Sequence, residues 1–115
     1  MLVVDDEPVV SRSLGRLLTS HGFDVRTCES GSLALTLLEE ADADVVVTDL
    51  NMPGLNGLAL LAEVKRRWPS ARRVLMSALA DTLSPEQLAE CAPNAVLAKP
   101  FDEAVLVAVI AGEER

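Results

Sequence analysis

Short apolar runs alternate along the chain with segments of helical periodicity, and this alternation limits the fold more than any other feature. Four runs rich in aliphatic and β-branched residues predict strands buried on both faces of a parallel sheet: Leu2–Val4, Val45–Val47, Val74–Met76 and Ala95–Ala98. The more mixed run Phe23–Cys28 predicts a fifth strand towards one edge. Strands of this kind need helices on both faces of the sheet.

Five helices are predicted in the intervening and final segments. Apolar residues recur at helical spacing from Val10 to Leu18 and again from Leu33 to Leu38. The other signals are the apolar series Leu58, Leu61, Val64 and Trp68 before Pro69, the N-cap sequence Ser84–Gln87, and the N-cap residue Asp102. Because crossovers between parallel strands are right-handed, we expect an α/β fold: one domain, residues 1–115, with a doubly wound five-stranded parallel sheet and five helices.

The charge balance excludes several classes of partner. Ten Lys and Arg against 18 Asp and Glu give a net charge of −8, so direct binding to nucleic acid or to an anionic membrane is not expected. The longest apolar run, Ala104–Ala111, is too short to span a bilayer, and the first residues lack the basic start of a signal peptide. We therefore expect a cytoplasmic protein in which Cys28 and Cys91 are unpaired.

Polar residues stand where four of the predicted strands end. Asp5 and Asp6 follow the first strand, Asp49 follows the third, Ser77 the fourth and Lys99 the last. Ligands of doubly wound sheets bind at the carboxyl ends of the strands, so these side chains are expected to converge. Carboxylates gathered in one place need a cation, and oxygen ligands without His or Cys suit Mg²⁺ together with phosphate oxygens. The sequence therefore predicts a site for Mg²⁺ and a phosphoryl group.

Four sequence blocks at compatible spacing resemble the signatures of response-regulator receiver domains: Val3–Pro8, Thr48–Gly57, Met76–Ala78 and Ala98–Phe101. The resemblance implies the flavodoxin-like strand order 2-1-3-4-5. It also implies a two-component phosphorelay, in which a sensor histidine kinase or a phosphotransfer protein donates a phosphoryl group from phosphohistidine. Such a domain catalyses only its own phosphorylation and dephosphorylation, and its change of conformation controls an output domain or a partner.

The resemblance also implies a role for each acidic residue. Asp49 would be the phosphoacceptor, and nucleophilic attack by its carboxylate would give an aspartyl phosphate. Mg²⁺ would be ligated by Asp6, by Asp49 and by the backbone carbonyl of Asn51, whereas Asp5 would hold the ion through water. These assignments predict a reaction that requires Mg²⁺.

The remaining site residues are assigned in the same way. Lys99 would pair with a phosphoryl oxygen, helped by a cis Lys99–Pro100 bond, and Ser77 would move towards another oxygen. Val96 stands where many receivers carry Tyr or Phe, which predicts a weaker or different route from Ser77 to the last strand. Leu79 offers no polar group to orient water, so we expect slow loss of phosphate, with Asn51 the only nearby side chain that could assist.

Three functions are alternatives to that of a phosphorylated receiver domain. A phosphatase of the haloacid dehalogenase class also uses a strand-end Asp and Mg²⁺, but it needs a second Asp where this chain has Asn51. A flavodoxin-type redox protein would cradle phosphate in its first loop, where this chain has Asp5 and Asp6. A receiver that acts only as an interaction domain is suggested by Val96 alone.

The last predicted helix is apolar on every face. This leaves two interpretations open: a helix buried more than usual, or a surface through Val105, Val107 and Val109 that contacts an output domain, a partner or a second copy of the chain. In the second case, Val107→Glu or Val109→Glu would disrupt a homodimer.

Overall fold

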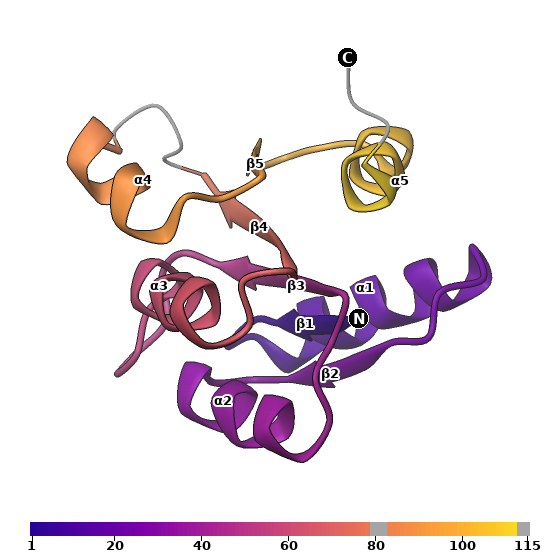
Figure 1. Ribbon diagram of the computed structural model, residues 1–115. Helices are drawn as coiled ribbons and strands as arrows, with labels where there is room; N and C mark the ends of the chain where they lie inside the picture. The colour runs from indigo at the N-terminus through magenta and orange to yellow at the C-terminus, as the bar shows by residue number, and fades with distance from the viewer. Residues whose placement is uncertain (79–82, 113–115) are drawn as a thin grey trace.

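The computed structural model describes residues 1–78 and 83–112, and within them five parallel strands form one sheet in the order β2-β1-β3-β4-β5 (Figure 1). The strands are β1 (Leu2–Val4), β2 (Arg26–Cys28), β3 (Val45–Asp49), β4 (Arg72–Ser77) and β5 (Ala95–Ala98). The strand order and the parallel pairing confirm the expected fold class. Leu79, for which a role in phosphate loss was predicted, lies outside the described residues.

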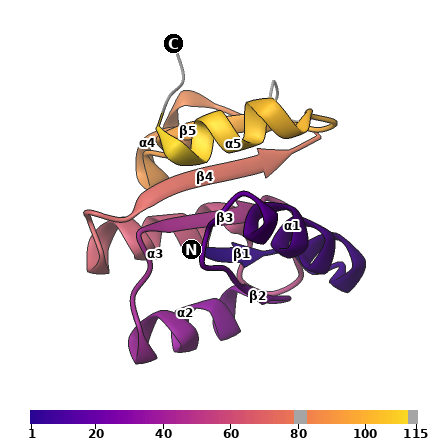
Figure 2. The ribbon, with the colours of Figure 1, turned by 90° about the vertical axis from the view of Figure 1, so that its right-hand side faces the viewer.

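Five helices cover the two faces of the sheet. They are α1 (Pro8–Ser20), α2 (Gly31–Glu40), α3 (Gly57–Arg67), α4 (Pro85–Cys91) and α5 (Glu103–Ala111). Helices α1 and α5 lie on one face, and α2, α3 and α4 lie on the other (Figures 1 and 2). The predicted N-caps are confirmed, since Ser84 and Asp102 accept hydrogen bonds from the backbone of Gln87 and Val105.

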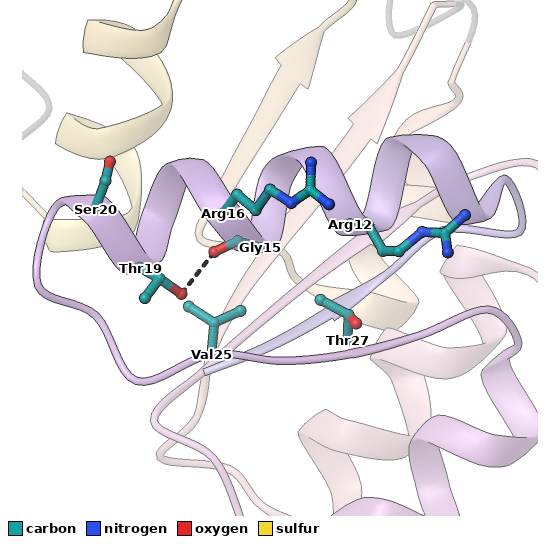
Figure 3. A pocket seen from close by; sticks show the side chains of 7 residues that line it. All are labelled: Arg12, Gly15, Arg16, Thr19, Ser20, Val25 and Thr27. Atoms are coloured by element: carbon teal, nitrogen blue, oxygen red, sulfur yellow. Dashed lines mark hydrogen bonds between the residues drawn. The ribbon is translucent and has the colours of Figure 1, made fainter.

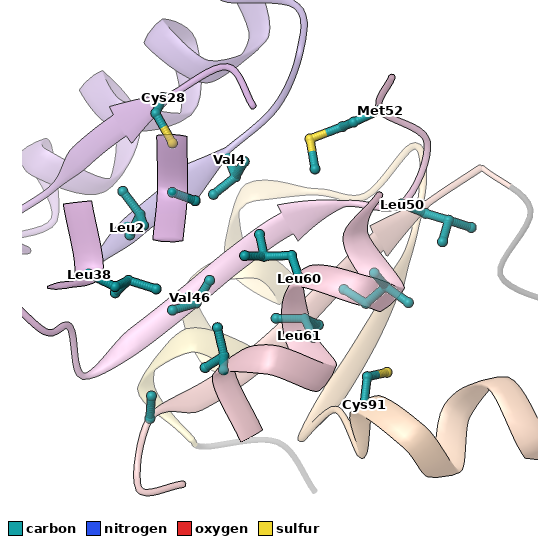
Figure 4. Packing of buried hydrophobic residues seen from close by; sticks show 14 residues of the cluster. Leu2, Val4, Cys28, Leu38, Val46, Leu50, Met52, Leu60, Leu61 and Cys91 are labelled. Atoms are coloured by element: carbon teal, nitrogen blue, oxygen red, sulfur yellow. The ribbon is translucent and has the colours of Figure 1, made fainter. Parts of the chain in front are cut away.

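Each face of the sheet has its own apolar core. In β1, Leu2 and Val4 pack into the core beneath α2 and α3 (Figure 4), whereas Val3 points to the opposite face and packs beneath α1 and α5. All three side chains are fully buried. Burial on both faces explains why the strands read as continuous apolar runs and not as alternating ones.

Three strands differ in length from the prediction. Strand β3 continues beyond Val45–Val47 to Asp49. Strand β2 is shorter than Phe23–Cys28, because its first residue, Arg26, already pairs with Leu2 at the start of β1. Strand β4 is longer than Val74–Met76, because Arg72, Arg73 and Ser77 also join the ladder. An apolar run does not predict polar strand residues, so the sequence pattern missed both arginines.

The apolar residue Trp68 and the valines of the last helix differ in how deeply they are buried. Trp68 ends α3 and is only partly buried, with the Arg67 guanidinium 4.5 Å from its ring centre. In α5, Val109 is a core residue and Val107 is half-buried against the same core, whereas Val105 is 45% exposed. Val109 therefore does not belong to a contact surface, and Val109→Glu would test folding and not dimerisation.

Cys28 and Cys91 are free and buried, as expected. Across residues 1–78 and 83–112, no helix has both the length and the apolar character needed to cross a lipid bilayer.

Candidate functional site

The carboxyl edge of the sheet brings together the polar residues that were predicted to converge. Asp5 follows β1, Asp49 and Ser77 end β3 and β4, and Lys99 follows β5. Backbone pairing fixes these strand ends relative to one another: the Lys99 N–H donates to the Ser77 carbonyl at 3.0 Å, and the Leu50 N–H donates to the Met76 carbonyl at 2.9 Å. The site is therefore built on the rigid part of the fold.

Lys99 joins two of the carboxylates. Its Nζ donates a hydrogen bond to Asp49 Oδ1 at 2.8 Å and lies 3.5 Å from Asp5 Oδ2, a distance too long for a good hydrogen bond. The Lys99–Pro100 peptide bond is cis, as the sequence resemblance implied. The side chains of Asp49 and Lys99 are 14% and 28% exposed, so the pair remains accessible to a reactant.

Asp5 is the buried carboxylate of the group, at 1% exposure. Its Oδ1 accepts the Glu7 backbone N–H at 3.0 Å, whereas its Oδ2 has no hydrogen-bond partner within the described part of the chain. Burial raises the pKa of Asp5 above its ordinary value, despite the hydrogen bond from Glu7 and the nearby charge of Lys99. A buried carboxylate oxygen without a donor is the kind of group that a cation satisfies.

Three carboxylates meet at this edge of the sheet. Asp5, Asp6 and Asp49 each place an oxygen within 4.8 Å of the other two. Among residues 1–78 and 83–112, the salt bridges to these carboxylates come from Lys99, and one ammonium does not balance three carboxylates. The all-oxygen donor set fits a hard divalent ion such as Mg²⁺.

The same charges act on Lys99. Its burial disfavours the ammonium, but the hydrogen bond and the charge of Asp49, with a further contribution from Asp5, raise the pKa of Lys99 above its ordinary value. Lys99 is therefore positively charged at neutral pH.

Gly57 lets the loop after Asp49 pack against the strand end. A Cβ atom at Gly57 would collide with the Asp49 carbonyl oxygen and lie 2.9 Å from Leu50 Cα. Asn56 then caps α3, with its Oδ1 accepting the Ala59 N–H at 2.9 Å. Asn51 is exposed in this loop, two residues after Asp49.

Two surface hollows flank α1, and the sequence analysis identified neither. The first, of about 510 Å³, opens beside Lys99 and is lined on its apolar side by Val10, Leu14 and Phe101. Val10 and Leu14 belong to the apolar series at helical spacing from Val10 to Leu18, and Leu14 also packs against the core. Periodicity could not show that both residues also line a groove. This hollow places apolar surface next to the reactive groups.

The second hollow, of about 480 Å³, lies between α1 and β2, on the other side of α1 (Figure 3). Arg12 and Arg16 line it from the helix, and Thr27 lines it from the strand. At Gly15 the helix comes so close to β2 that an added Cβ would lie 2.9 Å from Thr27 Cγ2. Gly15 therefore allows the close packing of α1 on the edge strand.

The sequence profile of the response regulator receiver domain matches residues 1–111, and the chain belongs to this family. The structure agrees with those of other receivers. It superposes on the response regulator TrrA from Thermotoga maritima, solved in complex with Mg²⁺ and BeF, with a TM-score of 0.87, 27% identity and coverage of 98% of this chain and 96% of that one. Vibrio cholerae CheY4, at 24% identity, has the same fold, with a TM-score of 0.85 and coverage of 98% and 96%.

The curated relatives are longer proteins. The DNA-binding transcriptional regulator NtrC of Klebsiella pneumoniae is 35% identical over 108 residues, which are 94% of this chain and 23% of NtrC. The transcriptional regulatory protein KdpE of Mycobacterium tuberculosis is 35% identical over 101 residues, 88% of this chain and 44% of KdpE. The chain thus spans less than half the length of these relatives.

Proposed function

We propose that Asp49 is the phosphoacceptor of a two-component phosphorelay, within a receiver domain that comprises residues 1–115. The observation that carries this proposal is the surroundings of the Asp49 carboxylate, which has the Lys99 ammonium at 2.8 Å and two further carboxylates within 4.8 Å. A nucleophile, a cation for the phosphoryl oxygens and ligands for a metal are all needed for phosphoryl transfer, and here they share one edge of the sheet.

Asp5, Asp6 and Asp49 would hold Mg²⁺, with Asp5 acting through water and the Asn51 carbonyl completing the set. Their convergence supports this assignment, as does the Oδ2 of Asp5, which accepts no hydrogen bond from the described residues. When bound, Mg²⁺ neutralises charge on the transferred phosphoryl oxygens.

In the transfer itself, an Asp49 oxygen attacks phosphorus while the bond from phosphorus to the donor nitrogen breaks. The electron pair of that bond stays on the donor imidazole, and the product is an aspartyl phosphate. The Lys99 ammonium, now at Asp49 Oδ1, is placed to pair with a phosphoryl oxygen. Ser77 ends the adjacent strand and would donate its hydroxyl to another. The chain thus catalyses its own phosphorylation and dephosphorylation and no other reaction.

The donor is a sensor histidine kinase or a phosphotransfer protein. The apolar hollow beside Lys99 and the neighbouring Val9, which is 70% exposed, support docking of such a partner along α1. Docking there would bring a phosphohistidine to the exposed side of the Asp49–Lys99 pair.

The phosphorylated domain would control an output domain or a partner, by analogy with the transcriptional regulators to which it is similar. The exposed Val105 and the half-buried Val107 offer apolar contacts for that partner or for a second copy of the chain. This domain would make no direct contact with nucleic acid or membrane. Its cytoplasmic location, expected from the sequence, stays a prediction.

A ¹⁹F NMR titration with beryllofluoride, a mimic of the phosphoryl group, tests the proposed site. We expect a bound fluoride signal that requires Mg²⁺ and disappears in Asp49→Asn. The matched control is Asp44→Asn, because Asp44 is an exposed carboxylate at the opposite end of β3. A bound signal that persists in Asp49→Asn, or its absence from the folded wild type with Mg²⁺, would contradict the proposal.

A further inference from the structure

Two adjacent arginines at the start of β4 each hold the C-terminal end of a different helix. Successive side chains of a strand point to opposite faces of a sheet. Arg72 accordingly reaches α5 on one face, and Arg73 reaches α4 on the other. Both contacts lie at the end of β4 that is remote from Ser77 and the phosphoacceptor site.

Arg73 is the more deeply buried of the two, at 9% exposure. Its Nε donates to the carbonyls of Cys91 and Ala92 at 3.0 and 3.2 Å, and its Nη2 donates to Ala92 at 2.9 Å. Its Nη1 donates to the Ala71 carbonyl at 3.2 Å. A buried guanidinium that lost these acceptors would be left uncompensated, so the bonds strongly favour a fixed end of α4.

The backbone conformation at the end of α4 also indicates that this end is held in place. Ala92, the C-cap residue, adopts a left-handed conformation with φ of 39°, which an alanine rarely adopts. The backbone of Arg73 is also paired with Asn94, whose Oδ1 accepts the Arg73 N–H at 2.7 Å. Side-chain and backbone bonds therefore hold the segment after α4 against β4.

Arg72 makes the corresponding contact with α5. Its Nε donates to the Val109 carbonyl at 2.8 Å, within the last turn of the helix. Its guanidinium also packs against the end of α5, with Cζ 3.9 Å from the position that a Cβ of Gly112 would occupy. Carbonyls at the C-terminal end of a helix carry partial negative charge, which favours a cation there.

The N-terminal ends of the two helices are held differently. Each begins with a cap made within its own first turn, by Ser84 in α4 and by Asp102 in α5. The start of α5 also follows Lys99 closely along the chain. These ends lie towards the carboxyl edge of the sheet, where Asp49 would be phosphorylated.

We propose that Arg72 and Arg73 form a clamp that fixes the C-terminal ends of α5 and α4, so that phosphorylation displaces only their N-terminal ends. This inference rests on the proposed phosphorylation of Asp49. The clamp would let a change at the phosphorylated site reach the surface of α4 and α5 without an aromatic ring at position 96, where this chain has Val96. The surface altered by phosphorylation is then the first turn of each helix.

Amide hydrogen exchange with and without beryllofluoride and Mg²⁺ tests where the change occurs. We expect the exchange rates of residues 84–88 and 103–106 to change by about tenfold or more, and those of residues 90–94 and 109–112 to change by less than about twofold. Changes of equal size along the whole of both helices, or largest at their C-terminal ends, would overturn the clamp.

The variant Arg73→Met tests the clamp without any phosphoryl mimic. We expect it to speed exchange at residues 90–94 by about tenfold relative to the wild type. The control Arg66→Met removes an exposed arginine whose partner, Glu63, lies in its own helix, and should leave these residues unchanged. Wild-type exchange in a folded Arg73→Met would overturn the clamp.

If Arg73→Met does not fold, Arg72→Met gives the same test at residues 109–112. Beryllofluoride binding is measured separately by ¹⁹F NMR. Failure of the mimic to bind would therefore count against phosphorylation of Asp49, whereas the exchange of the variants would still decide whether the clamp exists.

Discussion

The Lys99 ammonium hydrogen-bonds the Asp49 carboxylate at 2.8 Å across an intervening strand, since β4 lies between β3 and β5 in the sheet. The contact therefore ties together strand ends that are not directly paired. It also holds the proposed nucleophile beside the cation that would receive the phosphoryl oxygens. The Asp49–Lys99 pair therefore contributes both to the stability of the fold and to the proposed phosphoryl transfer. Its removal should lower the stability and the reactivity.

Lys99→Met should lower the free energy of unfolding by about 1–3 kcal/mol without Mg²⁺, because Asp49 and Asp5 lose their shared cation. Added Mg²⁺ should recover part of this loss, since the ion would balance the same carboxylates. Urea denaturation with EDTA or with Mg²⁺ measures both effects. Equal stability of variant and wild type in EDTA would show that the ion pair contributes nothing to folding.

Asp5→Asn should stabilise the Mg²⁺-free protein at pH 7 by about 1 kcal/mol. Burial raises the folded-state pKa of Asp5, so its contribution to stability falls as the pH rises from the unfolded-state pKa through the folded-state pKa. Above the folded-state pKa the full cost of the buried charge is present, and Asn removes it while keeping an acceptor for the Glu7 N–H.

The same urea experiments, repeated at pH values from 4 to 7, should show the advantage of Asp5→Asn shrinking as the pH falls. Mg²⁺ should stabilise the wild type more than the variant. A variant that is less stable than the wild type in EDTA at pH 7 would contradict this account of Asp5.

Gly57→Ala should destabilise the fold by about 1–3 kcal/mol, because the new methyl group would meet the backbone of Asp49 and Leu50, which cannot move aside. Gly15→Ala is the matched control, since its nearest neighbour is a side-chain methyl group of Thr27. Thermal or urea unfolding compares the two. A smaller loss for Gly57→Ala than for Gly15→Ala would show that the loop after Asp49 adapts.

Val105→Glu and Val109→Glu should behave differently, although both residues belong to the apolar last helix. Val105 is exposed, so Glu there should change the unfolding free energy by no more than about 0.5 kcal/mol. Val109 lies in the core, and a buried Glu should cost more than about 3 kcal/mol.

Sedimentation velocity of folded Val105→Glu then tests the contact surface of α5. A dimer through this surface would give a wild-type sedimentation coefficient that falls in the variant. The same coefficient in both proteins would remove α5 as the site of self-association.

The order of elements and the convergence of Asp5, Asp49 and Lys99 were predictable, because buried parallel strands leave long apolar runs and polar residues mark where those runs end. The cluster of carboxylates was predicted in the same way, and a metal was expected there because crowded carboxylates need a cation. Strand order was implied by the family resemblance and not by any local pattern.

The arginine contacts and the surface of α5 were not predictable in this way. Arg73 is a charged residue whose burial depends on carbonyls at the end of α4 as well as on the nearby carbonyl of Ala71, and such a set of acceptors leaves no periodic pattern in the sequence. In α5 every position is apolar from Ala104 to Ala111, so periodicity could not separate buried Val109 from exposed Val105. The burial of Arg73 and that of the α5 valines are determined by packing in the folded chain.

Intact mass after incubation with Mg²⁺ and phosphoramidate tests the central claim most directly. The account predicts one added phosphoryl group on the wild type, its loss with EDTA, and its loss in Asp49→Asn. An adduct that persists in Asp49→Asn, or no adduct on a folded protein that binds both Mg²⁺ and beryllofluoride, would contradict phosphorylation of Asp49.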